Sequence, residues 1–240
     1  MTGSATTALI TGANKGLGHE TARRLADLGW TVWLGARDIA RGETAAAAIR
    51  AGQPAAEVRP LSLDVTDNES VRAAYDTVTG AGTGLDVLVN NAGIGTDRAA
   101  PLDTAPADLA LVYGVNVLGP VRVTREFLPL LRKSPAPRLV MVSSGLGSFG
   151  VVTDRTGLAS AFVDLVYPSS KAALNMVTVM YEKALPDVRV TAVDPGYTAT
   201  DLNGFTGTQT VAEGSAAIVT ACTAARLDSG FISRHGAVPW

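Results

Sequence analysis

Tyr167 and Lys171 are the residues whose types and spacing most directly suggest chemistry in this 240-residue chain. Residues four positions apart lie on the same face of a helix, close enough for their side chains to interact. A lysine ammonium beside a phenol favours the phenolate and lowers the pKa of the tyrosine towards neutrality. Such a tyrosine can protonate a carbonyl oxygen or accept the proton of an alcohol. The same spacing also arises by chance, so the interpretation depends on the rest of the chain.

A glycine-rich turn near the start of the chain is the second feature with a chemical interpretation. An apolar run ends at Ile10, the turn contains Gly12, Gly16 and Gly18, and a helical pattern follows as far as Gly29. A strand, a glycine-rich turn and a helix direct backbone N–H groups and a helix N-terminus at a pyrophosphate. Glycines serve here because side chains would block the turn and the approach of phosphate. The alternative is a turn with a purely structural purpose.

The residues after a second predicted strand, 31–35, bear on which nicotinamide cofactor fits. Enzymes that use NAD commonly place an acid there to accept from the ribose 2′-OH, whereas this sequence has Ala36 followed by Arg37. Arg37 and Lys15, which lies in the glycine-rich turn, would give two cations for a 2′-phosphate. The alternative is that Asp38 acts as a displaced ribose acid. The sequence favours NADP(H) over NAD(H).

Predicted strands and helices alternate along the rest of the chain. Further strands are expected at 58–63, 86–89, 139–142, 190–193 and 230–232, and further helices at 41–50, after a capping box at 66–69, and at 105–131, 167–184 and 211–225. This alternation predicts a single α/β domain over residues 1–240. Its fold is expected to be Rossmann-type and doubly wound, with helices flanking a mainly parallel sheet of about seven strands.

Polar residues follow several of the predicted strands, at the sheet edge where ligands bind in open parallel sheets. Ser143 and Ser144 follow the fifth strand and are placed either for function or to initiate a turn. Asp64 either accepts from an adenine amino group or caps its turn. Asn90 and Asn91 can satisfy neighbouring backbone groups or line a cleft, and we interpret them as structural.

Asn116 and two loops complete the polar features. Asn116 lies among apolar residues of a predicted helix and must find partners, so it either bridges the helix to a neighbour or orders a chain of water. Residues 145–166, which separate Ser144 from Tyr167, are expected to form a substrate-side loop. Residues 201–210, after a turn fixed by Pro195 and Gly196, are expected to form a second such loop that acts as a mobile lid.

Composition limits the classes of partner. The net charge of −2 and pI near 5.7 argue against surfaces for nucleic acid or for anionic membranes. Cys222 is the only cysteine and is expected to be buried, which fits a reducing, cytoplasmic location. His19 and His235 are isolated, so no metal site is expected. The segment before Thr7 lacks the pattern of a signal peptide. A small molecule is the expected partner.

Together these features resemble the short-chain dehydrogenase/reductase family over essentially the whole chain. The motifs stand in family order: Thr11-Gly12-x-x-x-Gly16-x-Gly18, Asn90-Asn91-Ala92-Gly93, Ser144, Tyr167-x-x-x-Lys171 and Pro195-Gly196. The glycine-rich turn, the sequence Ala36-Arg37-Asp38 and the final residues 236–240 are similar to the NADPH carbonyl reductase branch. The long loop before Tyr167 also resembles that branch, where such an insertion can obstruct the usual subunit interface. A monomer, a dimer and a tetramer therefore all stay open.

The resemblance implies a role for each matching residue. Tyr167 would protonate the carbonyl oxygen, Ser144 would hydrogen-bond it, and Lys171 would bind the nicotinamide ribose and lower the Tyr167 pKa. Asn116 would hold a water that relays protons to Lys171. Thr198 and Thr200 would contact the carboxamide and pyrophosphate. The residues implied to hold the cofactor are Gly12, Asn14, Lys15, Gly16, Leu17, Gly18, Arg37, Asp64, Val65, Asn91, Ala92, Gly93, Tyr167, Lys171, Pro195, Gly196, Thr198 and Thr200.

The function expected from these residues is NADPH-dependent reduction of a ketone or aldehyde, or the reverse oxidation of an alcohol. The alternative from another class is a non-catalytic NADP-binding protein that senses redox state on the same fold. A nucleotide-sugar epimerase is a weaker alternative because the chain lacks length for a sugar-binding subdomain. The substrate is not readable, since specificity lies in loops that vary without changing the core.

Overall fold

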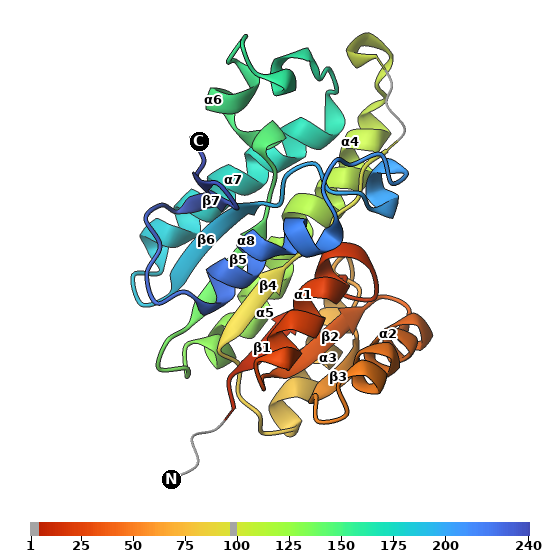
Figure 1. Ribbon diagram of the computed structural model, residues 1–240, viewed down its shortest axis with the longest axis vertical. Helices are drawn as coiled ribbons and strands as arrows, with labels where there is room; N and C mark the ends of the chain where they lie inside the picture. Colours follow the sequence, from red (N-terminus) through yellow and green to blue (C-terminus); the bar gives the residue numbers. More distant parts are fainter. Residues whose placement is uncertain (1–4, 97–99) are drawn as a thin grey trace.

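The computed structural model describes residues 5–96 and 100–240, so residues 1–4 of the segment expected to lack a signal peptide lie outside the described residues. Within those residues, one sheet contains the strands β1 (Thr7–Ile10), β2 (Thr31–Ala36), β3 (Val58–Ser62), β4 (Val87–Asn90), β5 (Arg138–Val142), β6 (Arg189–Asp194), β7 (Phe231–Ser233) and β8 (Gly236–Ala237). Their order across the sheet is β3-β2-β1-β4-β5-β6-β7-β8 (Figure 1). Strands β1 to β7 pair in parallel, and only β8 is antiparallel. The predicted doubly wound α/β fold is confirmed.

The eighth strand is the part of the sheet that the sequence did not predict. β8 turns back on β7 through a tight connection in which Gly236 has a φ of 109°. A two-residue strand leaves no periodic pattern to read. The expected seven strands match β1 to β7, and β8 adds a short antiparallel edge.

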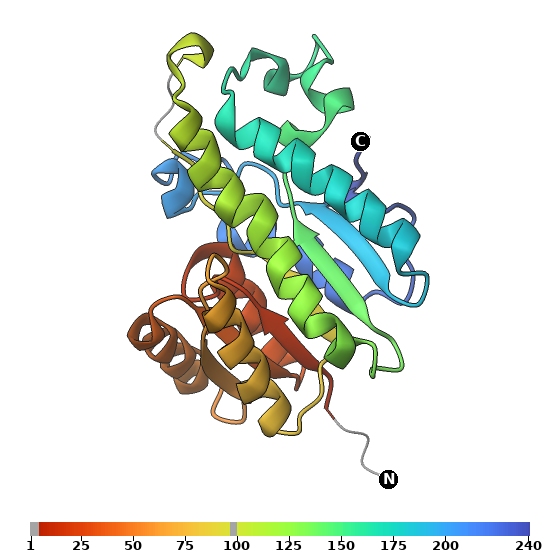
Figure 2. The same cartoon turned by 180° about the vertical axis from the view of Figure 1, so that it is seen from behind.

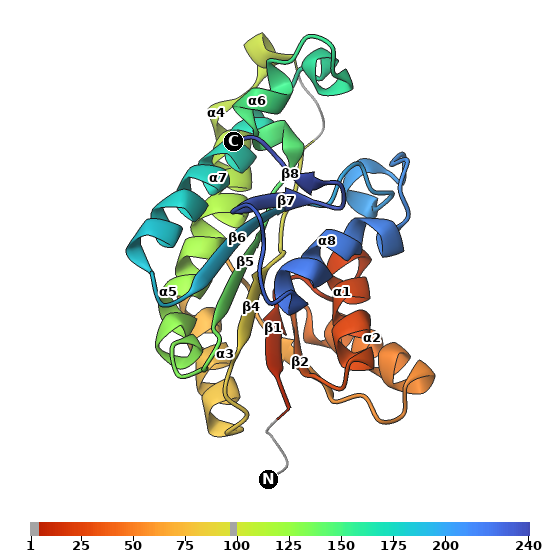
Figure 3. The ribbon, with the colours of Figure 1, turned by 60° about the vertical axis from the view of Figure 1, so that its left-hand side comes forward.

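Helices cover both faces of the sheet, as Figure 3 shows. One face carries α1 (Gly16–Asp27), α2 (Ile39–Gly52) and α8 (Val211–Thr223). The other face carries α3 (Asn68–Gly80), α5 (Gly119–Leu131) and α7 (Val166–Ala184), and Figure 2 shows α5 and α7 side by side. None of the helices in the described residues combines the length and apolarity needed to cross a membrane.

Two apolar cores hold these layers together because side chains alternate between the faces of each strand. In β1, Ile10 packs with residues of α1, α2 and α8, while Leu9 packs into the other core with Phe127 of α5 and Leu174 of α7. Each of these four side chains is at most 1% exposed. Burial of both sheet faces explains why the strands read as continuous apolar runs.

The long helix expected at 105–131 is present but carries an interruption. α4 (Pro106–Tyr113) passes into a π-helical turn, Gly114–Leu118, which leads directly into α5. Single π turns are rare and occur often at functional sites. Asn116 lies in this turn and is completely buried, so the irregularity coincides with the one amide predicted inside the helix.

The capping box predicted at 66–69 is wrong, although a helix does begin there. The carboxylate of Asp67 caps α3 by accepting from the Glu69 N–H at 2.9 Å. The Thr66 hydroxyl and N–H instead donate to Asp64 Oδ1, at 2.7 and 2.9 Å. The Asp64 carboxylate therefore closes its own turn, and Thr66 is not available to cap the helix.

The predicted loop at 145–166 contains short helices. These are the 3-10 turn Gly145–Gly147, α6 (Phe149–Val152) and the 3-10 turn Leu158–Ala161. Together with the start of α4, the loop extends beyond the carboxyl end of the sheet (Figure 1). The 145–166 loop therefore lies at the carboxyl edge of the sheet, where the polar site residues were predicted to lie.

Candidate active site

Tyr167, Ser144 and Lys171 come together at the carboxyl end of β5. Ser144 follows directly from the end of β5, and Tyr167 and Lys171 lie in the first two turns of α7. The Ser144 side chain lies beside the Tyr167 phenol, and its hydroxyl acts to lower the pKa of that phenol. The Lys171 ammonium lies over the Tyr167 ring, 5.6 Å from its centroid. The residues selected from the sequence are thus brought into one cluster.

The pKa of Tyr167 was expected to be lowered by Lys171, but in this structure it is raised. Burial of the phenol, together with the charges of Asp194 and Asp164, raises the pKa of Tyr167 to about 12, although the Ser144 hydroxyl acts to lower it. The Lys171 ammonium donates to the Val142 carbonyl oxygen at 2.8 Å. Sequence spacing predicted the proximity of lysine and phenol, but it carried no information about burial or about the two acids.

Lys171 is itself an unusual group because only 3% of it is exposed. Burial lowers the pKa of Lys171 to about 8, since a charged ammonium is poorly solvated in the interior. The side chain has its single hydrogen bond, among the described residues, with Val142. A buried lysine held near its titration range is a feature typical of functional sites.

Both polar groups of Asn116 have protein partners. Its Oδ1 accepts from the Ile94 N–H at 2.9 Å, and its Nδ2 donates to the Ile94 carbonyl at 2.9 Å and to Ser170 Oγ at 3.0 Å. Asn116 therefore joins the π turn both to α7 and to the chain beyond β4. A Cβ atom on Gly93 would lie 3.5 Å from Asn116 Oδ1 and 3.6 Å from Lys171 Nζ. The amide and the ammonium thus face the same glycine.

The two serines after β5 have different positions. Ser143 is buried, and its hydroxyl donates to Asn175 Oδ1 at 2.5 Å, which fixes β5 to α7. Asn175 in turn donates to the Gly147 carbonyl at 3.0 Å. Ser144, the second of the pair, is the one beside Tyr167. Asn175 was not singled out in the sequence, although it follows Tyr167 and Lys171 at helical spacing, eight and four positions on.

The glycine-rich turn has the features of a phosphate cradle. Gly12 and Gly16 have φ values of 62° and 55°, which favour glycine. A Cβ atom on Gly18 would lie 2.5 Å from Asn91 Nδ2, so this position also requires glycine for packing. α1 begins after Lys15 with no side-chain cap and no acid in its first turn. The uncapped N–H groups at this helix end suit an anion such as a pyrophosphate.

Asn90 and Asn91 both bond to neighbouring parts of the chain, as their structural interpretation requires. Asn91 Nδ2 donates to the carbonyls of Thr11 and Gly12, at 2.8 and 3.1 Å, and thereby fixes the glycine-rich turn. Asn90 Nδ2 donates to Thr124 Oγ1 of α5 at 3.0 Å. Ala92 lies against Gly12, where a Cβ atom would come within 2.9 Å of the Ala92 Cα.

The residues at the end of β2 favour one of the two cofactor interpretations. The Asp38 carboxylate accepts from the Arg41 N–H at 3.3 Å and caps α2, so it already has a structural partner. Arg37 is exposed and has no hydrogen bond or ion pair with the described residues. Lys15 forms an ion pair with Asp201. The end of β2 and the glycine-rich turn therefore present one cation each. Of these, Lys15 has a carboxylate partner, Asp201, in the 201–210 loop.

Asp64 and Val65 lie beside this region. Although partial burial opposes ionisation, hydrogen bonds from Thr66 and the charges of Arg37 and Arg122 lower the pKa of Asp64. Of the two roles considered for Asp64, the structure contains the turn-capping one. Val65 is buried, and a Cβ atom on Gly119 would lie 2.9 Å from Val65 Cγ2. Its carbonyl accepts from Arg122 at 2.5 Å.

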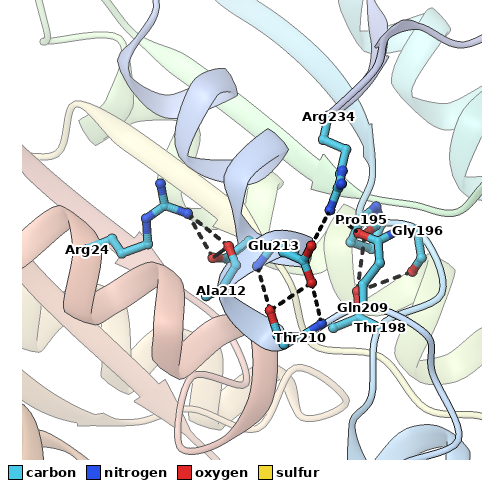
Figure 4. Close-up of polar contacts among 10 residues, drawn as sticks. Arg24, Pro195, Gly196, Thr198, Gln209, Thr210, Ala212, Glu213 and Arg234 are labelled. Carbon is cyan, nitrogen blue, oxygen red and sulfur yellow. Dashed lines mark hydrogen bonds and ion pairs between the residues drawn. The ribbon is translucent and has the colours of Figure 1, made fainter.

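The segment from Pro195 to α8 is held at several points, as Figure 4 shows. Thr198 Oγ1 donates to the Pro195 carbonyl at 3.1 Å. Thr210 and Glu213 form a capping box at the start of α8, and Arg234 pairs with Glu213 at 3.0 Å. The Thr210 N–H and Arg234 together lower the pKa of Glu213 to about 2. The loop expected to act as a lid is thus anchored where it joins α8.

The remaining predicted site residues of this segment lie near the glycine-rich turn. A Cβ atom on Gly16 would lie 3.5 Å from Thr200 Cγ2, and one on Gly214 would lie 2.9 Å from Leu17 Cδ2. Gly196 has a φ of 72°, and its N–H donates to Asp194 Oδ1 at 3.0 Å. Asn14 lies half-buried in the turn.

Cys222 and the potential metal ligands do not contribute to the cluster around Tyr167. Cys222 is buried on α8, where burial raises the pKa of its thiol to about 12, as expected for a small apolar residue. Among the described residues, no group of three or more His, Cys, Asp or Glu side chains could hold a metal ion.

Comparison with known proteins defines the class to which this fold and site belong. Residues 6–210 match the family model described as short chain dehydrogenase. The chain therefore belongs to the short-chain dehydrogenase family, a family of oxidoreductases that bind a nicotinamide cofactor.

Three similar proteins illustrate the range of the family. Short-chain dehydrogenase anuI of Penicillium roqueforti is 36% identical over 222 residues, covering 90% of this chain and 87% of that protein. The (+)-neomenthol dehydrogenase of Arabidopsis thaliana is 33% identical, covering 88% and 89%. The NADPH-bound carbonyl reductase from chicken fatty liver has a TM-score of 0.83 and 27% identity, covering 98% and 99%.

Proposed function

We propose that the protein is an NADPH-dependent oxidoreductase that reduces a ketone or aldehyde to an alcohol, and can catalyse the reverse reaction. The observation that carries this proposal is the placement of the Ser144 hydroxyl and the buried Lys171 ammonium beside the Tyr167 phenol. A phenol, a hydroxyl and an ammonium gathered at the carboxyl end of a parallel sheet suit a developing negative charge on a carbonyl oxygen. The names of the NADPH-bound carbonyl reductase and the neomenthol dehydrogenase support the same class of reaction.

Each residue of the cluster has one proposed task. Tyr167 donates its proton to the carbonyl oxygen, and Ser144 donates a hydrogen bond to that oxygen. Lys171 binds the nicotinamide ribose and stabilises the charge left on Tyr167. Asn116 holds the π turn, α7 and the chain at Ile94 in register, as its three hydrogen bonds indicate. The bound NADPH supplies the hydride.

The protonation state of Tyr167 suits a general acid. Burial raises the pKa of Tyr167 to about 12, so the phenol retains its proton throughout the neutral range. A general acid must carry its proton when the carbonyl oxygen needs it. Tyr167 is therefore in the form required for carbonyl reduction, whereas alcohol oxidation requires the phenolate.

The choice of NADP(H) is proposed from the charges after β2. Ala36 ends the strand where an NAD enzyme commonly has an acid, and Asp38 is occupied in capping α2. Arg37 is exposed and forms no hydrogen bond or ion pair with the described residues, so its guanidinium can form paired hydrogen bonds with a phosphate. Lys15 supplies a second cation after it separates from Asp201.

Replacing Arg37 by alanine is expected to weaken NADPH binding by about tenfold or more, because a hydrogen bond between charged groups is lost. NADH lacks the 2′-phosphate, so its affinity should change little. The measurement is calorimetric titration of both cofactors, with Arg72→Ala as the control because Arg72 is an exposed arginine on α3. Equal losses for NADPH and NADH would remove the argument for a 2′-phosphate site.

A further inference from the structure

Asp194 is a carboxylate beside the catalytic cluster that the family motifs leave without a task. It ends β6, directly before the turn formed by Pro195 and Gly196. The Ser143 N–H donates to the Val193 carbonyl at 2.8 Å, so the end of β6 lies against the chain that carries Ser144. The sequence predicted this residue only as part of a turn.

The two oxygens of Asp194 have different surroundings. Oδ1 accepts from the Gly196 N–H at 3.0 Å and closes the turn. Oδ2 lies directly against the backbone of Gly145, where a Cβ atom would approach it to 2.9 Å. No hydrogen bond or ion pair with any residue from 5–96 or 100–240 reaches Oδ2, and the residue is only half-buried. One oxygen is thus structural, and the other is available to a ligand.

The position of Asp194 places this available oxygen close to the reacting group. Gly145 is adjacent in the chain to Ser144, whose side chain lies beside the Tyr167 phenol. The charge of Asp194 contributes to the raised pKa of Tyr167, second only to burial. The Lys171 ammonium of the cluster is bonded to the Val142 carbonyl oxygen, and Asp194 forms no ion pair with the described residues. A negative charge therefore remains uncompensated beside the site proposed for the substrate carbonyl.

We propose that Asp194 determines substrate specificity by accepting a hydrogen bond from a hydroxyl or ammonium group on the carbon next to the substrate carbonyl. This inference rests on the proposed carbonyl reduction. A donor at that position would pair with Oδ2, and hydrogen bonds to charged groups are among the stronger ones in proteins. A carboxylate at the same position would face Asp194 with like charge and is disfavoured. The expected substrates are 2-hydroxy or 2-amino carbonyl compounds, and 2-oxo acids are excluded.

The test compares three aromatic ketones that differ only beside the carbonyl: 2-hydroxyacetophenone, acetophenone and benzoylformate. The wild type should prefer them in that order. Asp194→Asn keeps an oxygen for the Gly196 N–H but removes the charge. It should reduce the preference for 2-hydroxyacetophenone over acetophenone by about tenfold, and it should increase kcat/KM for benzoylformate. A fourth ketone, the protonated amine 2-(dimethylamino)acetophenone, tests an ammonium donor in place of the hydroxyl. Its preference over acetophenone should fall more in Asp194→Asn than that of 2-hydroxyacetophenone, because its interaction with Asp194 depends more strongly on charge.

Asp164→Asn is the matched control. Asp164 also raises the pKa of Tyr167, but its Oδ1 accepts from the Val166 N–H at 2.8 Å at the start of α7. This variant should leave the order of the ketones unchanged. Unchanged ratios of kcat/KM among the ketones in Asp194→Asn, or an equal change in both variants, would overturn the proposal while leaving carbonyl reduction intact. Failure of the wild type to reduce any ketone, in spite of bound NADPH, would contradict the proposed function itself.

Discussion

Replacing Tyr167 by phenylalanine is expected to lower kcat/KM for carbonyl reduction by about 10²–10⁴-fold, the usual contribution of a positioned general acid. The phenol is the proton donor proposed for the carbonyl oxygen, and the Ser144 hydroxyl lies beside it. Phenylalanine keeps the ring and its packing beside Lys171 but carries no proton to donate. The measurement is steady-state oxidation of NADPH with a carbonyl substrate, together with NADPH affinity by titration.

The control for this variant is Tyr181→Phe. Tyr181 lies on the same helix, and burial raises the pKa of its phenol too, but it packs into the core at the other end of α7. Its loss should leave kcat/KM close to the wild-type value. NADPH affinity should fall far less than kcat/KM in Tyr167→Phe, because the proton itself is needed for the reaction and not for binding. Full turnover by Tyr167→Phe would contradict the mechanism.

Replacing Lys171 by methionine is expected to lower turnover by about 10²–10³-fold, since a charge that stabilises the reacting oxygen is lost. The same change should make the protein more stable. Burial lowers the pKa of Lys171 from 10.5 to about 8, so at neutral pH the folded state carries an ammonium that is better solvated in the unfolded chain. Methionine removes this penalty, which amounts to as much as about 3 kcal/mol.

The sign of the pH dependence follows from the lowered pKa. Between pH 8 and 10.5 the unfolded chain holds more protons on Lys171 than the folded protein does, so the wild type gains stability as the pH rises. The advantage of Lys171→Met should therefore be greatest below about pH 8 and disappear above about pH 10.5. Urea unfolding of both proteins across this range measures it.

Lys183→Met provides the comparison for this experiment, because Lys183 is exposed in the last turn of α7. Its removal should change neither turnover nor the pH dependence of unfolding appreciably. A Lys171→Met protein that is less stable than the wild type at every pH would show that the ammonium contributes to folding. The interpretation of Lys171 as a group kept for function at a cost in stability would then be wrong.

Sequence patterns predicted the fold well because both the strand and helix signals came from burial. The apolar runs of β1, β4 and β5 are buried on both faces, so each gave a clear signal. The features that escaped prediction are local: the two-residue β8, and Asp67 rather than Thr66 as the cap of α3. The periodicity of apolar residues does not show which of several nearby polar side chains caps a helix. It also does not show a strand of only two residues.

The composition of the cluster was predictable, but its electrostatics were not. Tyr167 and Lys171 are close because helix geometry requires it. The Tyr167 pKa depends on burial and on Asp194 and Asp164, and of these two acids Asp194 is brought near the phenol only by the folding of the chain. The same applies to Lys15, whose partner Asp201 lies far away in the sequence. Contacts between residues that are far apart in the sequence determine the electrostatics of this site. A single sequence does not show which distant residues make such contacts.

The most direct test of the central claim is titration of the purified protein with NADPH and with NADH, followed by NADPH oxidation in the presence of a panel of ketones and aldehydes. We expect preferential binding of NADPH and turnover of at least one carbonyl compound, with turnover lost in Tyr167→Phe. Tight NADPH binding without turnover of any member of the panel would contradict carbonyl reduction, and would favour a protein that senses the cofactor without using it.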